Sequence, residues 1–342
     1  MNNRFRVGVA AMAIAALFLL GACGDDDGDT DSTATATATA TVAATAAPTE
    51  AATAVPTEMA TVYPLTIRDL IGREVIIEAP PQRIVTTSPS AIEMLYAAGG
   101  EAIARSETAV HPDGVSSLPS VGPSYAPAFE AILELAPDLV LADASAQAHL
   151  AEAFGGALQG IPVVFIGAVG YADVATSINL IGQVIGNPEA AASAAAELTA
   201  ALEEVQAASE GKTAPRVLIM NGAITDFFVA LPDSFVGNLV ALAGGENVAE
   251  GQPPTGRYPG YTQLSLEAIV ETDPEVILTI TAGPPVGPTL ADLVLDDPTF
   301  ADLTAVTNGR VYNLDVEIYL QAPGPRAAQG LRELSALLFG AE

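Results

Sequence analysis

The side chains that most often carry covalent or acid–base chemistry are scarce in this chain of 342 residues, which has one cysteine, one lysine and two histidines. Ser88 and His111 are suited to act as nucleophile and base, but nothing in the sequence places them together. Gly211-Lys212-Thr213 resembles the end of a phosphate-binding loop, but Gln206 stands where that loop needs its first glycine. The sequence also lacks the Gly-x-Ser-x-Gly and His-Glu-x-x-His patterns. We therefore predict that the protein is not an enzyme, with an extracellular α/β hydrolase as the alternative.

Metal coordination is equally poorly supported. A bare metal ion needs several histidine, cysteine or carboxylate ligands close together. The two histidines, His111 and His149, are 38 positions apart. We predict neither a site for a free metal ion nor a bound cofactor.

The cysteine has a different chemistry, set by its place near the N-terminus. Arg4 and Arg6 precede an apolar run from Val7 to Leu20, which is shorter than the roughly 20 residues that span a bilayer. The run ends in Leu20-Gly21-Ala22-Cys23, which resembles a bacterial lipobox. The pattern predicts a signal peptide over residues 1–22 and a diacylglyceryl group on Cys23. The lipid would hold the protein on the outer face of the cytoplasmic membrane, in a periplasm or on the surface of a single-membrane cell.

Composition changes sharply after this cysteine. Residues 23–62 contain an aspartate cluster and then Thr/Ala low complexity with Pro48 and Pro56, so we expect a disordered tether. Loss of Arg4 and Arg6 with the leader would change the formal charge from −29 to −31. Such an acidic chain is unsuited to nucleic acid or to broad adhesion to anionic lipids.

The remaining residues alternate short apolar runs with helical patterns, which favours an α/β fold with buried parallel strands. The predicted strands are Val75–Ile77, Ile84–Thr87, Leu139–Ala142, Val163–Ile166, Val217–Met220, Val276–Ile280 and Val311–Leu314.

An internal repeat indicates two related lobes. Phe129-Glu130-Ala131-Ile132-Leu133 matches Leu266-Glu267-Ala268-Ile269-Val270 at an offset of 137 residues, and a proline and an apolar strand follow each copy. Between the copies, Pro188 to about Ser209 is rich in helix-forming residues and would span roughly 33 Å as one helix. Asn187 is placed to act as its N-cap and Gly211 to end it. We expect an N-terminal lobe at 63–186, a connecting helix at 187–210 and a C-terminal lobe at 211–342.

A series of short motifs, each weak alone and specific in this order, covers the chain from about residue 63 to its C-terminus. They are Thr66-Ile67-Arg68-Asp69-Leu70, Pro80-Pro81-Gln82-Arg83-Ile84-Val85, Ser88-Pro89-Ser90-Ala91, Glu130-Ala131-Ile132-Leu133, Pro137-Asp138-Leu139-Val140, Leu264-Ser265-Leu266-Glu267-Ala268, Asn308-Gly309-Arg310-Val311-Tyr312 and Pro323-Gly324-Pro325-Arg326. With them the chain resembles the class III solute-binding proteins, which deliver iron complexes and vitamin B12 to ABC importers. The resemblance implies two Rossmann-like lobes joined by a single long α-helix, with ligand held between them, and we expect a monomer.

The resemblance also implies roles for particular residues. In the family a glutamate on each lobe pairs with arginines of the permease, which works with an ATPase, and Glu130 and Glu267 occupy these places. Two carboxylates on duplicated lobes suit a two-fold-symmetric partner. A surface adhesion or structural lipoprotein would not explain this pair.

Ligand contacts are expected at the carboxyl ends of the strands. The candidates are Ser88, Ser90, Tyr125, Asn221, Arg257, Tyr258, Tyr261 and Tyr319. Tyrosines suit the rim of a corrin, a porphyrin or a catecholate. Anionic catecholates usually call for several arginines, whereas Arg257 is the main candidate and Arg105 the lesser one. A siderophore-type iron chelate of low charge or a corrinoid therefore fits best. Haem, with Tyr125 or His111 as axial ligand, is the alternative within the same fold.

Overall fold

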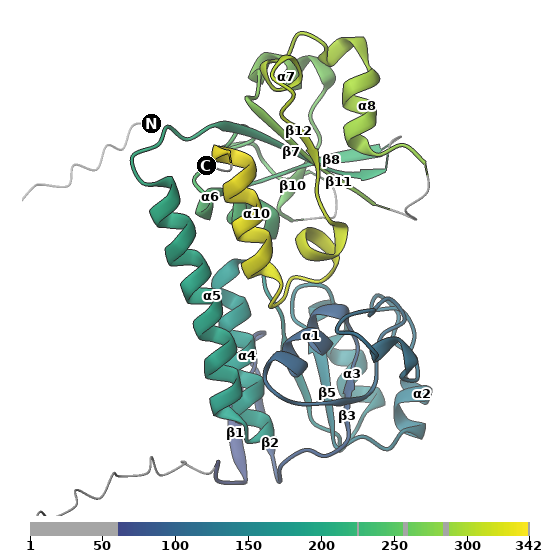
Figure 1. The fold of residues 1–342 in the computed structure, drawn as a ribbon. Helices are drawn as coiled ribbons and strands as arrows, with labels where there is room; N and C mark the ends of the chain where they lie inside the picture. Colours follow the sequence, from purple (N-terminus) through teal and green to yellow (C-terminus); the bar gives the residue numbers. More distant parts are fainter. Residues whose placement is uncertain (1–60, 224–225, 256–258, 283–286, 341–342) are drawn as a thin grey trace, which may run out of the picture. The chain divides into compact units, whose positions relative to one another are not determined.

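The computed structural model describes residues 61–223, 226–255, 259–282 and 287–340. Cys23, Arg257 and Tyr258 lie outside the described residues. The described chain forms two α/β lobes joined by the long helix α5 (Pro188–Ser209) (Figure 1). We call the elements from β1 to α4 the N-lobe and those from β7 to α10 the C-lobe.

The N-lobe has a parallel four-stranded sheet in the order β4-β3-β5-β6. Its strands are β3 (Ile84–Thr86), β4 (Ala102–Ala104), β5 (Leu139–Asp143) and β6 (Val163–Ile166). Its helices are α1 (Pro89–Ala97), η1 (Val115–Ser117), α2 (Phe129–Glu134), η2 (Ala148–Leu150), α3 (Ala151–Ala157) and α4 (Tyr171–Ile185). All five residues of β5 are buried, as expected for a strand covered on both faces.

The C-lobe sheet has the order β10-β8-β7-β11-β12, with β9 pairing the start of β7. Its strands are β7 (Arg216–Ala223), β8 (Asp226–Ala230), β9 (Glu246–Asn247), β10 (Tyr261–Thr262), β11 (Val276–Thr281) and β12 (Val311–Asn313). Its helices are α6 (Phe235–Leu242), α7 (Leu266–Thr272), α8 (Leu290–Asp296), η3 (Pro298–Phe300), α9 (Thr304–Thr307), η4 (Glu317–Gln321) and α10 (Ala327–Phe339).

The expectation of parallel strands is met in the N-lobe sheet and only partly elsewhere. The strand predicted at Val75–Ile77 belongs to an antiparallel hairpin of β1 (Leu65–Arg68) and β2 (Glu74–Ile77), outside the main sheets. In the C-lobe, β8 and β10 are antiparallel to their neighbours. Short strands such as β4 and β10 carry too few residues for a periodic signal, which is why the sequence did not indicate them.

The connecting helix begins as predicted. The Asn187 side chain accepts a hydrogen bond from the backbone N–H of Ala190, and Pro188 opens the first turn. The last helical residue is Ser209, and Gly211 follows with φ 72°, a conformation that glycine adopts without a steric penalty. The Gly211-Lys212-Thr213 segment therefore follows a helix, as the sequence indicated.

The internal repeat has the same local structure in both lobes. A short helix, α2 or α7, is followed by a buried strand, β5 or β11. At the end of the two helices, Ala136 and Asp273 both have positive φ angles, 45° and 38°. These residues are separated by the same 137 positions as the sequence match. This shared turn in two non-glycine residues supports a duplicated α/β unit.

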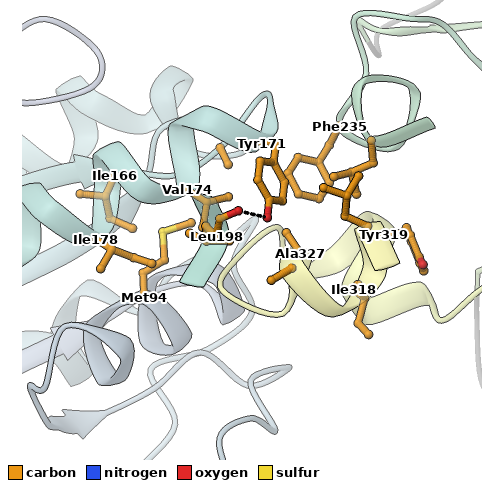
Figure 2. Packing of buried hydrophobic residues seen from close by; sticks show 14 of the residues in the cluster. Met94, Ile166, Tyr171, Val174, Ile178, Leu198, Phe235, Ile318, Tyr319 and Ala327 are labelled. Atoms are coloured by element: carbon orange, nitrogen blue, oxygen red, sulfur yellow. Dashed lines mark hydrogen bonds between the residues drawn. The ribbon is translucent and has the colours of Figure 1, made fainter. Parts of the chain in front are cut away.

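Side chains from both lobes meet in one apolar cluster beside α5, part of which Figure 2 shows. Tyr171 at the start of α4 lies near Phe235 of α6 and donates its hydroxyl proton to the Leu198 carbonyl of α5 at 2.8 Å. Its backbone N–H donates to Asn238 Oδ1 of α6 at 2.9 Å. The N-lobe is therefore held to both α5 and the C-lobe by buried contacts.

Candidate functional site

The carboxyl ends of β3 and β5 carry a buried polar network that includes two of the predicted ligand residues. The Ser90 hydroxyl donates to Asp143 Oδ2 at 2.9 Å, and Ser88 Oγ caps α1 by accepting from the Ala91 N–H. Both serines are only 2% exposed. Ser88 and Ser90 thus shape this edge of the lobe through internal hydrogen bonds. The Asp143 carboxylate also accepts three hydrogen bonds through Oδ1, from the backbone N–H groups of Ser145 and Ala146 and from the Ser145 hydroxyl.

Gln147 connects this network to the segment that carries Tyr125. Its fully buried amide donates to the Thr87 carbonyl at 3.1 Å and to the Ser124 carbonyl at 2.6 Å, and its oxygen accepts from the Thr87 hydroxyl. Tyr125, the next residue after Ser124, is 79% exposed. A buried amide therefore fixes the backbone from which an exposed aromatic ring projects. Sequence reasoning missed Gln147, because a lone glutamine has no recognisable spacing.

On the C-lobe, Asn221 lies near the end of β7 and is only 8% exposed. Its Oδ1 has no hydrogen-bond partner within the part of the chain that the structure describes. A buried acceptor without a donor is costly, and ligands or water usually satisfy such groups. Tyr261 on β10 is partly buried, and burial raises the pKa of its hydroxyl to about 12.

Tyr319 does not lie where a ligand could touch it. It is fully buried in η4, and its hydroxyl bonds to the Gly330 carbonyl and to Glu333 of α10, each at 2.9 Å. The expectation that Tyr319 faces a ligand is therefore not met in this structure. Tyr319 follows Glu317 and Ile318 in η4 and packs inward as part of the core shared by η4 and α10.

A chain of charged groups joins the two lobes. Glu93 of α1 is 5% exposed, and its carboxylate accepts a bidentate pair of hydrogen bonds from Arg326, from Nε at 2.9 Å and from Nη2 at 2.7 Å. Arg326 also lies 3.4 Å from Glu317, and the Glu317 carboxylate lies 3.1 Å from His111 Nε2 of the N-lobe. His111 is thus engaged by a carboxylate, and no hydrogen bond joins it to Ser88 in the described part of the chain. The pairing that a serine nucleophile would need is not formed.

Arg105, the lesser candidate for binding an anionic ligand, is committed to the backbone. Its Nη1 donates to the carbonyls of Ser106 and Glu107, and its Nη2 donates to the Ser116 carbonyl at 3.0 Å. These bonds hold the loop that precedes Tyr125. The guanidinium thus has a structural role in this conformation.

Two hollows lie close to these groups. One, of about 170 Å³, is lined at the ends of β5 and β6 by residues that include Ser145, Gly167 and Val169. The other, of about 580 Å³, is lined by Glu93, Tyr96 and His111 of the N-lobe and by Arg326 of the C-lobe. The second hollow is therefore bounded by both lobes and by the Glu93–Arg326 pair.

Glu130 and Glu267 are both exposed, in the first turns of α2 and α7, which belong to different lobes (Figure 1). Hydrogen bonds from its own backbone N–H and from the Ser265 hydroxyl lower the pKa of Glu267. Both carboxylates are therefore presented to solvent on repeat-related helices.

The two helices are also anchored in the same way. Arg83, just before β3, donates to the carbonyls of Leu135 and Ala136 at the end of α2. Arg216, the first residue of β7, donates to those of Thr272 and Asp273 at the end of α7. The backbone N–H of each arginine in turn donates to a carboxylate, Asp138 or Glu275. The arginines are 133 positions apart and therefore do not align at the repeat's offset of 137.

Two classes of feature are missing from the described ranges. Among residues 61–340 outside the three short gaps, no group of three or more histidine, cysteine, aspartate or glutamate side chains is arranged to hold a metal ion. In the same ranges no helix has the length and apolarity to cross a bilayer.

Comparison with known proteins gives consistent similarities. The family described as periplasmic binding protein matches residues 84–317. A substrate-binding lipoprotein of an ABC transporter from Bacillus subtilis is 27% identical over 284 residues, which cover 80% of this chain and 85% of that protein. A cobalamin-binding protein from Halobacterium salinarum is 27% identical over 79% of this chain and 73% of its own length. A solved periplasmic haem-binding protein from Pseudomonas aeruginosa is 26% identical with a TM-score of 0.64, over 76% of this chain and 94% of that one.

Proposed function

This chain belongs to the periplasmic binding protein family, and from that premise we propose that it is a lipid-anchored receptor that captures a corrinoid or a siderophore-type iron chelate of low charge. It serves an ABC importer as a substrate-binding protein and is not an enzyme. In the proposal the ligand is held between the lobes, and the lipid on Cys23 keeps the receptor at the membrane. The Bacillus subtilis relative, itself named a lipoprotein, supports the anchor.

The observation that carries the ligand class is that the strand ends, as far as the structure describes them, offer no free cation to a ligand. Uncharged polar groups in the described part of these strand ends include Ser88, Ser90 and the buried acceptor of Asn221. Asp143 and Arg105 are both occupied by internal hydrogen bonds. A strongly anionic chelate would need free cations in a desolvated site. A corrinoid with neutral amide side chains supplies donors for a buried acceptor and needs no such cations.

Haem is the second candidate, and one observation favours it. Tyr125 is 79% exposed and follows Ser124, whose carbonyl Gln147 holds, so its ring is accessible to a ligand. A tyrosine phenolate is one of the axial ligands that haem iron accepts. The similarity to the Pseudomonas aeruginosa haem-binding protein points the same way.

Titration of the full-length protein separates these candidates. The protein is purified from membranes of the source cells, and the variant Cys23→Ser should no longer be found in those membranes. Quenching of tyrosine fluorescence then measures the binding of cyanocobalamin, haemin and a ferric hydroxamate. We expect a Kd of about 1 μM or below for cyanocobalamin or the hydroxamate, equivalent to about 8 kcal/mol of binding free energy. If haemin binds more tightly than the other two ligands, and Tyr125→Phe abolishes this binding, haem is the ligand. Flat titrations with all three ligands would disprove the proposal.

A further inference from the structure

The two helices that carry Glu130 and Glu267 also share an exposed apolar position. Leu133 is 44% exposed and Val270 is 37% exposed, and they are equivalent at the offset of 137 residues. A single exposed aliphatic side chain is ordinary on a protein surface, but a partner that covers it gains free energy from its burial. Here the exposure recurs at matching positions of a duplicated unit.

Each of these residues lies on a stripe with two carboxylates. Glu130, Leu133 and Glu134 are spaced i, i+3 and i+4, which places them on one face of α2. Glu267, Val270 and Glu271 have the same spacing on α7, and all six residues are exposed. The buried Ile132 and Ile269 lie one residue before the aliphatic side chain and anchor each helix to its lobe. We call these two faces the paired stripes.

The charges of the paired stripes have no opposite charge paired with them in the described ranges of the chain. No ion pair to any of the four carboxylates is found among the described residues, and neither helix contains a basic residue. A protein partner that covers these stripes must therefore bring cations to both ends of each stripe and an apolar surface to its middle.

We propose that Leu133 and Val270 are docking contacts, each seated between two carboxylates against an equivalent site of a two-fold-symmetric membrane permease. The inference rests on the proposed delivery function, and adds to the two glutamates an apolar contact on each lobe. The partner site has arginine side chains flanking an apolar recess, and it occurs twice because the duplicated lobes present the same stripe twice. The arginine anchors at Arg83 and Arg216 hold both helices at matching places in their lobes.

Crosslinking tests this contact without knowledge of the ligand. Single variants Leu133→Cys and Val270→Cys carry a photoreactive maleimide and are mixed with right-side-out membrane vesicles from the source organism. Ile76→Cys and Leu295→Cys are matched controls, because these aliphatic residues are 55% and 53% exposed and lie on β2 and α8. We expect both test positions to label the same ABC permease subunit at least about tenfold more strongly than the controls, about the factor that burial of one aliphatic side chain supplies. Labelling from one lobe only, or equal labelling by the controls, would overturn the inference.

Uptake separates this inference from the delivery function itself. The double variant Leu133→Ser with Val270→Ser is compared with Glu130→Ala with Glu267→Ala, using whichever of cyanocobalamin, haemin or the hydroxamate binds in the titration. We expect both variants to lower uptake at least about tenfold with unchanged Kd, while Ile76→Ser with Leu295→Ser keeps normal uptake. Loss of uptake in the alanine variant alone would leave docking intact and refute the apolar contact. Normal uptake in both variants would refute docking as well.

Discussion

At the scale of single residues, burial of tyrosine side chains links the stability of the fold to pH. Tyr171 is 4% exposed and joins α4 to α5 through its hydroxyl. Burial raises its pKa to about 12, and burial likewise raises that of Tyr261 to about 12. A raised tyrosine pKa means that the folded state keeps a proton that the unfolded state has already lost. The contribution of these tyrosines to the free energy of unfolding is therefore fully present below the ordinary tyrosine pKa of 10 and is lost as the pH rises towards 12.

This linkage predicts a specific alkaline response. Denaturant unfolding at a series of pH values should show a constant free energy up to about pH 9.5 and a decline above it, by about 1.4 kcal/mol per pH unit for each tyrosine that keeps its proton. The double variant Tyr171→Phe with Tyr261→Phe should show a smaller decline from a lower starting stability. An unchanged slope in that variant would mean that these hydroxyls do not control the alkaline transition.

At the scale of elements, α4 and α5 pack closely because one position has no side chain. A Cβ built on Gly182 of α4 would lie 2.3 Å from the Ala191 Cβ of α5 and 3.0 Å from the Asn187 carbonyl oxygen. The two helices approach through this glycine next to the turn that opens α5. The connecting helix is thus positioned by packing as well as by its cap.

We predict that Gly182→Ala separates these helices and destabilises the protein by about 1–3 kcal/mol, the usual cost of overpacking. Gly156→Ala is the matched control, because Gly156 lies in α3 and a Cβ added there would meet no atom within 4 Å. That variant should be neutral or more stable by up to about 1 kcal/mol, the difference in helix propensity. Thermal unfolding of both variants decides the matter, and equal effects would show that α4–α5 contact is not tight.

At the scale of the whole molecule, charged groups hold the lobes together away from α5. Glu93 comes from α1, whereas Arg326 and Glu317 come from the C-lobe. Glu93 is nearly buried and the Arg326 side chain is 23% exposed, so water only partly screens their attraction. The mutual position of the lobes therefore depends on a charge pair as well as on the apolar cluster.

Removal of one charge should expose this dependence. We expect Glu93→Gln to lower the unfolding free energy by about 3 kcal/mol, because Arg326 would keep a desolvated charge without its main partner. Glu204→Gln is the control, since its pair with Arg332 is exposed and should contribute less than about 0.5 kcal/mol. Chemical denaturation measures both changes. Similar small losses in the two variants would place the Glu93 pair among ordinary surface contacts.

Much of the fold was predictable from local sequence because its signals are local. Buried strands such as β5 and β6 are continuous apolar runs, and the cap of α5 is a contiguous Asn-Pro pair. The repeat around Glu130 and Glu267 is a match of residue types at a constant offset of 137 positions, which the sequence shows directly. The antiparallel direction of β8 and β10 was not predicted, because strand direction is a property of pairing partners.

The candidate site was less predictable, because its contacts join residues far apart in the chain. Gln147 reaches Thr87 across 60 positions, and Glu93 reaches Arg326 across 233. Sequence alone indicated two α/β lobes, since apolar periodicity and the duplicated motif are properties of residue order, and its resemblance to the class III solute-binding proteins implied a binding function. Tertiary structure decided that Tyr319 is core, that Arg105 and His111 are already engaged, and that Leu133 and Val270 are exposed. Burial and charge pairing depend on three-dimensional neighbours, and residue order does not specify those neighbours directly.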